Sequence, residues 1–161
     1  MGFHLQFQYK ALDFSMYTFA SVGNDMVRNY ESIAPDANQL NYVLDRWTGE
    51  GTTNNTPRVT TAASVNNVFS TFYVEDASYI RIQNVQLGYT LNPKFSEKAG
   101  IDKLRLYASA NNLYTFTKYR GFDPGASSGL PLGGDNGNSA GIDDGFYPIP
   151  RTYMVGLNIN F

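Results

Sequence analysis

The sequence predicts an all-β fold built from about five antiparallel strands. Apolar and polar residues alternate with a period of two over several segments, which indicates strands with one face in an apolar environment. The connections between these segments are alternately short and long. Aromatic residues make up 15% of the 161 residues, whereas charged residues make up only 16%. An average soluble domain carries about 25% charged residues, so the composition also favours strands with neutral polar faces.

The first and last predicted strands show the clearest alternation. Residues on one side of each strand are apolar, and those on the other side are mostly polar and uncharged. Successive side chains of a strand point to opposite faces of its sheet, so this pattern separates an apolar face from a polar one. The apolar positions are Phe3, Leu5, Phe7 and Tyr9 in the first strand, and Tyr153, Val155, Leu157, Ile159 and Phe161 in the last.

Three inner strands are predicted over residues 13–22, 79–91 and 103–116. The second of them changes phase, because Val85 and Leu87 alternate correctly whereas Ile80 and Ile82 are out of step with them. Two explanations remain open at the level of sequence. Either a β-bulge near Asn84 inserts an extra residue, or the strand leaves its apolar environment at this point.

The connections cover residues 10–12, 23–78, 92–102 and 117–150. Successive connections of antiparallel strands lie at opposite ends of a sheet, so both long ones are expected at the same end. Short turns at one end and long loops at the other are typical of outer-membrane β-barrels, whose long loops are extracellular. Within the connections we expect helical turns at 93–99, a short helix after Pro35 that extends towards Trp47, and an irregular loop over 124–145.

The alternative to a membrane barrel is a soluble or surface-exposed β-sheet protein with a binding or adhesive role. Neutral polar faces, aromatic residues at strand ends and a final apolar strand ending at Phe161 favour the barrel. Even a small barrel needs about eight strands, so five are expected to be one part of a larger barrel. The chain opens directly on a strand pattern without a signal peptide, which supports the expectation of a fragment that is inactive alone.

The sequence gives little support for an enzyme, for nucleic-acid binding or for a cofactor. The net charge is −2 and cysteine is absent. His4, the only histidine, lies on the polar side of the first strand without a nearby acid, so we predict that it fills space there. Calcium is the one ion considered, although the spacing of the oxygen-bearing residues matches no EF-hand loop and solvated loop acids are the expected role. These residues are Asp135, Asn136, Asn138, Asp143 and Asp144.

Four further side chains are candidates for specific interactions. Arg46 and Trp47 combine a cation with a large ring in a long connection. The pair is expected to anchor its loop, and stacking on a sugar is the alternative. Arg81 and Arg105 fall on the polar side of their strands, where they are expected to pair with carboxylates of a plug or of the barrel wall.

Long ordered motifs of the chain resemble the C-terminal region of SusC/RagA-type TonB-linked outer-membrane transporters. Residues 76–91 read DASYIRIQNVQLGYTL, and residues 104–119 read LRLYASANNLYTFTKY, followed by GFDP at 121–124. The tail, residues 141–161, and the DRWT and PR motifs at 45–48 and 57–58 also match the family pattern. The resemblance covers roughly residues 1–161.

The resemblance implies that the chain forms the last five or so strands of a 22-stranded barrel, without the plug domain and the N-terminal strands. It further implies energy-dependent import of large nutrients, usually oligosaccharides and sometimes peptides. The implied partners are a SusD-like surface lipoprotein, TonB through the missing N-terminal region, and the barrel-assembly machinery. That machinery would read the alternating apolar positions of the last strand, with Phe161 as the terminal aromatic. The C-terminus would then be periplasmic.

Overall fold

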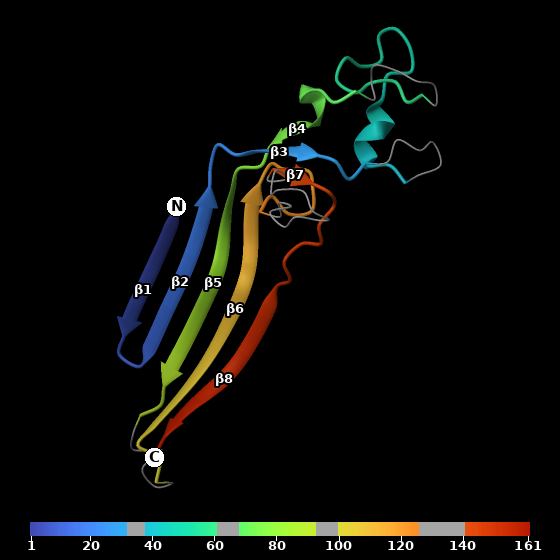
Figure 1. Cartoon of the computed structure of the whole chain (residues 1–161). Helices are drawn as coiled ribbons and strands as arrows, with labels where there is room; N and C mark the ends of the chain where they lie inside the picture. The colour runs from blue at the N-terminus through green and yellow to red at the C-terminus, as the bar shows by residue number, and fades with distance from the viewer. Residues whose placement is uncertain (32–37, 61–67, 93–99, 126–140) are drawn as a thin grey trace, which may run out of the picture. The chain divides into compact units, whose positions relative to one another are not determined.

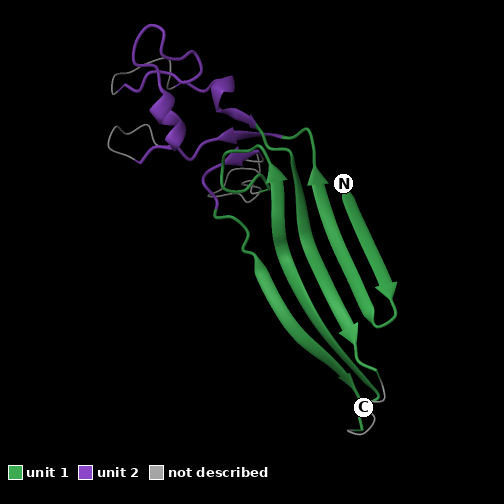
Figure 2. Cartoon of the chain, turned by 180° about the vertical axis from the view of Figure 1, so that it is seen from behind, with its two compact units in different colours: residues 1–24, 76–126, 147–161 green, residues 25–75, 127–146 purple. Residues whose placement is uncertain are grey.

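The computed structural model describes residues 1–31, 38–60, 68–92, 100–125 and 141–161. These residues form two compact units, which are coloured separately in Figure 2. Unit 1 comprises residues 1–24, 76–126 and 147–161, and unit 2 comprises residues 25–75 and 127–146. The chain therefore leaves unit 1 twice, once in each of its two long connections.

Unit 1 is a five-stranded antiparallel sheet with the order β1-β2-β5-β6-β8 (Figure 1). All five predicted strands are present, and each pairs with its neighbours in an up-and-down arrangement. The fold class expected from the sequence is thus confirmed. The strands are β1 (Gly2–Tyr9), β2 (Leu12–Ser21), β5 (Tyr79–Thr90), β6 (Lys103–Thr117) and β8 (Thr152–Asn160).

A bulge in β5 explains the phase change seen in the sequence. Tyr17 of β2 lies opposite Asn84, whereas the next residue, Thr18, lies opposite Ile82, so Gln83 is an extra residue without a partner in β2. The extra residue returns Ile80 and Ile82 to the face that carries Val85 and Leu87. Of the two explanations left open by the sequence, the bulge near Asn84 is therefore the correct one.

A second bulge lies next to the first, in β6. Asn111 lies opposite Asn84 and Tyr114 lies opposite Ile82, so β6 contains one more residue than β5 between these two pairs. Asn112 takes up the extra length with a left-handed φ of 52°. Asparagine tolerates this conformation better than most residues with a side chain.

The two ends of the sheet differ in the length of their connections. The tight turn at Lys10 and Ala11 and the connection from β5 to β6 share one end, together with the C-terminus (Figure 1). Both long connections leave from the opposite end. The predicted separation of short and long connections is confirmed.

Unit 2 contains structure that the sequence did not predict. A three-stranded sheet with the order β4-β3-β7 forms from segments that were assigned to the two long connections, and β3 runs parallel to β7. Of these segments, only that of β7 lies in the predicted irregular loop, 124–145. The helix expected after Pro35 is a short 3-10 helix, Asn41–Asp45, which ends before Trp47. The helical turns expected at 93–99 lie outside the described residues. The strands are β3 (Asp25–Arg28), β4 (Val74–Asp76) and β7 (Ile142–Asp143), and a second 3-10 helix spans Thr71–Tyr73.

The described residues bury very little apolar surface. Met26, Ala77 and Tyr119 are the buried hydrophobic residues among them. No helix in the described ranges is both long enough and apolar enough to cross a membrane. The sheet of unit 1 therefore has no hydrophobic core of its own, and its stability depends on what covers its apolar face.

Candidate functional site

One face of the sheet in unit 1 is almost entirely apolar. The register places the predicted apolar positions of all five strands on this face, because the two bulges restore the phase in β5 and β6. Many of these side chains are exposed, including Phe7 at 59% and Val155 at 84%. Soluble monomers rarely expose a contiguous apolar patch larger than a few hundred Å². The face is therefore suited to a hydrocarbon environment rather than to water.

The opposite face is polar and carries an ion pair that crosses a strand. Arg105 of β6 donates from Nε to Asp13 Oδ1 of β2 at 2.9 Å, and from Nη2 to the other carboxylate oxygen. Strand β5 lies between β2 and β6. The pair passes over Gly88 of β5, where a Cβ atom would collide with both side chains. The wall carboxylate expected for Arg105 is thus Asp13.

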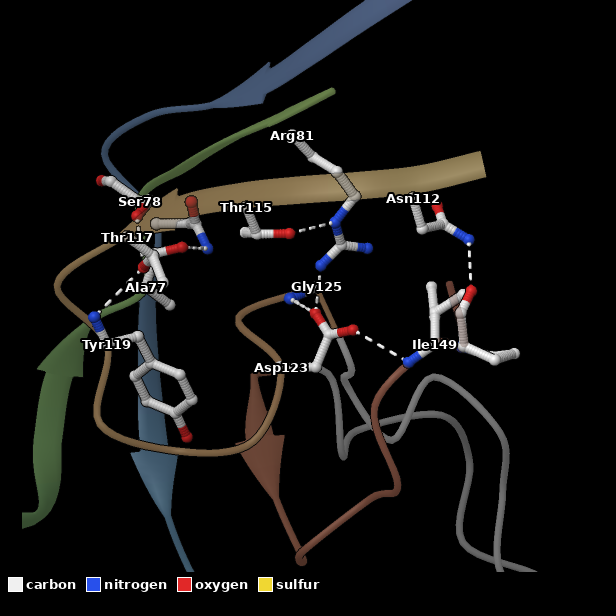
Figure 3. Close-up of polar contacts among 12 residues, drawn as sticks. Ala77, Ser78, Arg81, Asn112, Thr115, Thr117, Tyr119, Asp123, Gly125 and Ile149 are labelled. Atoms are coloured by element: carbon white, nitrogen blue, oxygen red, sulfur yellow. Dashed lines mark hydrogen bonds and ion pairs between the residues drawn. The ribbon is translucent and has the colours of Figure 1, made fainter. Parts of the chain in front are cut away.

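A second arginine on the polar face is buried at the end of the sheet from which the long connections leave (Figure 3). Arg81 is 4% exposed, and it pairs through Nη2 with Asp123, which is also 4% exposed. The Nε atom of Arg81 donates to Thr115 Oγ1 at 2.9 Å. Asp123 in turn accepts hydrogen bonds from the backbone N–H groups of Gly125, at 2.8 Å, and Ile149, at 3.3 Å.

The Arg81–Asp123 cluster joins three parts of unit 1 that are distant in sequence. Arg81 belongs to β5, Asp123 to the segment after β6, and Ile149 to the segment before β8. A carboxylate that accepts several backbone hydrogen bonds is a strong acceptor, and its pairing with a buried guanidinium leaves little freedom. The cluster therefore fixes the two ends of the connection between β6 and β8. The carboxylate expected for Arg81 comes from this connection and not from a strand.

The last strand lies as the sequence predicted. Tyr153, Val155, Leu157 and Ile159 lie on the apolar face and oppose apolar or small residues of β6. Phe161 follows the strand and is 86% exposed. Among the described residues, the outer edges of β1 and β8 have no partner strand. An unpaired edge offers a row of backbone donors and acceptors, so both edges are suited to pairing with further strands.

Unit 2 is organised around a buried arginine. Arg28 is 3% exposed, with Nε 2.7 Å from Glu31 Oε1 and Nη1 2.5 Å from Glu75 Oε1. Its guanidinium carbon also lies 4.9 to 5.8 Å from the centres of three aromatic rings, close enough for cation–π attraction. The rings are those of Tyr42, Phe72 and Tyr73.

Two tyrosines in unit 2 hold their protons more tightly than free tyrosine does. Burial, together with the hydrogen bond to Glu31, raises the pKa of Tyr42 above its ordinary value. Burial, together with the nearby charge of Glu75, raises the pKa of Tyr30 to about 12. Both side chains are therefore neutral near pH 7, and Tyr42 donates its O–H group to Glu31.

Arg46 and Trp47 lie in unit 2, directly after the first 3-10 helix, and their side chains have different surroundings. Arg46 Nη1 donates to the carbonyl oxygen of Val43 at 3.3 Å, which secures the end of the helix. The Trp47 side chain lines an open hollow, while its backbone N–H donates to Thr56 at 3.0 Å. The backbone of Trp47 therefore anchors the loop, while its indole ring remains accessible.

Two of the acids considered for calcium have other partners. Asp143 is 1% exposed, and its Oδ1 accepts the backbone N–H of Gly145 at 2.9 Å. Asp144 accepts the amide of Asn29 at 2.6 Å. Asp135, Asn136 and Asn138 lie outside the described residues. In the described part of the chain, no group of three or more His, Cys, Asp or Glu side chains is arranged to hold a metal ion.

The Arg28 cluster was not found from the sequence. Its ion pairs join residues 3 and 47 positions apart, and its rings come from both 3-10 helices. Only one signal was available, namely the grouping of Phe72 and Tyr73 close to Glu75 in the long connection 23–78. This signal does not identify a partner.

Comparisons with known proteins agree with this geometry. The chain is 35% identical over 161 residues to the TonB-dependent receptor P3 of Formosa agariphila, a match that covers 100% of the chain and 16% of that receptor. It is 27% identical over 166 residues to the TonB-dependent receptor SusC of Bacteroides thetaiotaomicron, covering 100% of the chain and 15% of SusC. No protein-family model matches the chain.

Solved structures give the same result for the fold. A structure of the RagAB peptide transporter superposes with a TM-score of 0.75 and 27% identity, covering 99% of this chain and 17% of the matched one. The relatives are receptors and transporters, and none of those named here is an enzyme. The chain spans about 16% of the length of the curated relatives it matches. The resemblance expected from the motifs is therefore confirmed: over its whole length this chain is similar to TonB-dependent receptors of the SusC/RagA type, and its sheet matches the C-terminal part of their barrel.

Proposed function

We propose that the chain forms the C-terminal wall of an outer-membrane TonB-dependent transporter that imports large nutrients. The observation that carries this proposal is the two-faced sheet, with an exposed apolar face, a neutral or ion-paired polar face and two outer edges without a partner strand in the part of the chain that the structure describes. A membrane-spanning barrel accommodates such a sheet, because lipid covers the apolar face and neighbouring strands satisfy the edges. The similarity to SusC and RagA over the whole chain supports the same proposal.

In this proposal the long connections are extracellular and the C-terminus is periplasmic. Outer-membrane barrels combine long extracellular loops with short periplasmic turns, and the two ends of this sheet differ in the same sense. Unit 2, which is formed from residues of both long connections, then belongs to the extracellular side. The turn at Lys10 and Ala11 belongs to the periplasmic side.

The proposed partners follow from the relatives and from the edges of the sheet. A SusD-like lipoprotein would cover the extracellular side, and TonB would act through a region outside this chain. The barrel-assembly machinery would engage β8, whose apolar positions and terminal Phe161 form the proposed assembly signal. The proposed cargo is an oligosaccharide, and a peptide is the second candidate because RagAB, whose structure this chain matches, is a peptide importer.

Membrane fractionation of the full-length protein that contains this chain tests the proposal. The protein is expected to pellet with outer membranes and to require detergent for extraction, because its apolar face is in lipid. Deletion of its gene is expected to abolish uptake of one class of large nutrient. Recovery of the intact protein in the soluble fraction without detergent would rule out the proposed wall.

A further inference from the structure

Unit 2 contains an open hollow that none of the contacts described above fills. Residues 47–58 fold back on themselves, closed by the hydrogen bond from the Trp47 N–H to Thr56. The hollow encloses about 560 Å³, within the range of roughly 300–1,000 Å³ that is usual for small-molecule sites. It is lined by Trp47, Asn54, Asn55, Arg58 and Phe72, among others.

The segment around the hollow is held by local hydrogen bonds. Thr52 Oγ1 donates to the Gly49 carbonyl at 2.7 Å and accepts the Thr48 N–H at 3.1 Å. Asn55 donates its N–H to Thr53 Oγ1 at 3.1 Å. A segment that is already ordered loses less entropy when a ligand binds, so the hollow is pre-organised.

One wall of the hollow belongs to the Arg28 cluster. The ring of Phe72 packs edge-on against Tyr73, with centroids 5.2 Å apart, and against Tyr42, with centroids 6.3 Å apart. Arg28 lies 5.3 Å from the centre of the same ring. Since Arg28 is buried and ion-paired, the Arg28 cluster holds the Phe72 ring in place on the side away from the hollow.

The lining combines aromatic rings, side-chain amides and the guanidinium of Arg58, groups that pack against a sugar ring and form hydrogen bonds with its hydroxyl groups. Trp47 is 38% exposed, so its broad apolar surface is available for contact with the C–H face of a sugar. The side-chain amides of Asn54 and Asn55 both donate and accept hydrogen bonds, as the hydroxyl groups at the edge of a sugar require. Among the described residues that line the hollow, none carries a carboxylate, the usual partner of the ammonium group of a peptide.

We propose that the Trp47 hollow binds one pyranose ring of an uncharged oligosaccharide. The ring stacks on Trp47, and its hydroxyl groups bond to Asn54 and Asn55. This inference rests on the proposed transport function, and it assigns the contact with the cargo to particular residues. It also gives the exposed Trp47 ring a role that loop anchoring through its backbone does not require.

Calorimetric titration of the purified full-length protein tests the inference. The probes are uncharged oligosaccharides derived from glucan, xylan, mannan and galactan, with a mixture of peptides of similar size as the comparison. The variant Trp47→Ala is expected to weaken the Kd of the sugar that binds by about tenfold or more, as for loss of an aromatic anchor. Trp47→Phe keeps a smaller ring and is expected to lose less.

Two further variants separate loss of stacking from damage to the loop. Asn54→Ala combined with Asn55→Ala removes the amides but leaves the ring and the backbone hydrogen bonds, and is also expected to weaken binding severalfold. Leu44→Ala is the matched control, because Leu44 is 77% exposed and lies outside the hollow. It is expected to bind as the unchanged protein does.

The outcomes distinguish the inference from the function on which it rests. If sugar binding is unaffected in both Trp47→Ala and the double asparagine variant, the proposed sugar site in the hollow is refuted, whereas the proposed transport function is not. Binding of peptides without binding of any sugar also refutes the proposed sugar site, whereas the proposed import of large nutrients is kept. Absence of binding, together with normal nutrient uptake after deletion of the gene, overturns both.

Discussion

Replacing Asp123 by alanine is expected to release the connection between β6 and β8 from the end of the sheet. The change leaves the guanidinium of Arg81 buried without its carboxylate, and it removes the acceptor of the Gly125 and Ile149 amides. Breaking a buried pair by removing one partner costs about 3–5 kcal/mol. Because about 1.4 kcal/mol corresponds to a factor of ten, local opening at this cluster should become roughly a hundredfold to a few thousandfold more frequent.

Hydrogen exchange of the full-length protein in detergent measures this opening. Peptides that contain the Gly125 and Ile149 amides should lose protection in Asp123→Ala, whereas peptides from β1 and β2 should not change. Asp45→Ala, which removes an exposed carboxylate in unit 2, serves as the control. The double variant Asp123→Ala with Arg81→Met should recover part of the protection, because it no longer buries an unpaired charge. Unchanged exchange in the single variant, or a double variant as unprotected as the single, would refute the reasoning.

Three other predictions concern the wall and unit 2. Gly88→Val places a side chain where Arg105 and Asp13 meet, and should lower the free energy of unfolding of the full-length barrel in denaturant by about 1–3 kcal/mol. Gly49→Ala, at an open position, should leave this free energy unchanged. Equal stability of the two variants would contradict the ion pair that crosses Gly88. Deletion of Phe161 should reduce barrel assembly without reducing synthesis, as measured by the folded fraction in outer membranes, and normal insertion would remove the proposed signal. The pKa of Tyr30 is raised by folding from 10.0 to about 12, so its contribution to stability is complete below pH 10 and is lost as the pH rises towards 12. Tyr30→Phe should therefore flatten this alkaline loss in the protease resistance of residues 25–75, and an identical pH profile would argue against the burial of Tyr30.

The sequence predicts the strands of unit 1 well because their pattern is local. Period-two alternation identifies each strand, and the lengths of the connections identify the two ends of the sheet. The bulge near Asn84 was one of two possibilities, and only the register with β2 decides between them. Arg105 was expected to pair with a carboxylate of a plug or of the wall. Its partner is Asp13 in the wall, which is 92 positions away and which nothing in the sequence singles out.

Unit 2 could not be predicted in the same way because long-range contacts define it. Strands β3 and β7 are four and two residues long, too short for alternation to be recognised. They pair across more than a hundred positions of the sequence. The helix after Pro35 was expected from apolar spacing, but only a 3-10 turn forms, in a segment whose Tyr42 packs on the buried Arg28. Local propensity does not contain this information.

The paired bulges of β5 and β6 have a consequence for counting membrane spans from sequence. A spanning strand needs about 9–11 residues. Strands β5 and β6 have 12 and 15 residues, but each is divided into two unequal pieces by an extra residue. A scan for uninterrupted alternation would score the pieces separately. Both pieces of β5, residues 79–82 and 84–90, would be too short and would be discarded, whereas the longer piece of β6, residues 103–111, just reaches the required length. Surveys of this kind would thus undercount the strands of related barrels, and the error would fall on strands long enough to extend beyond the bilayer.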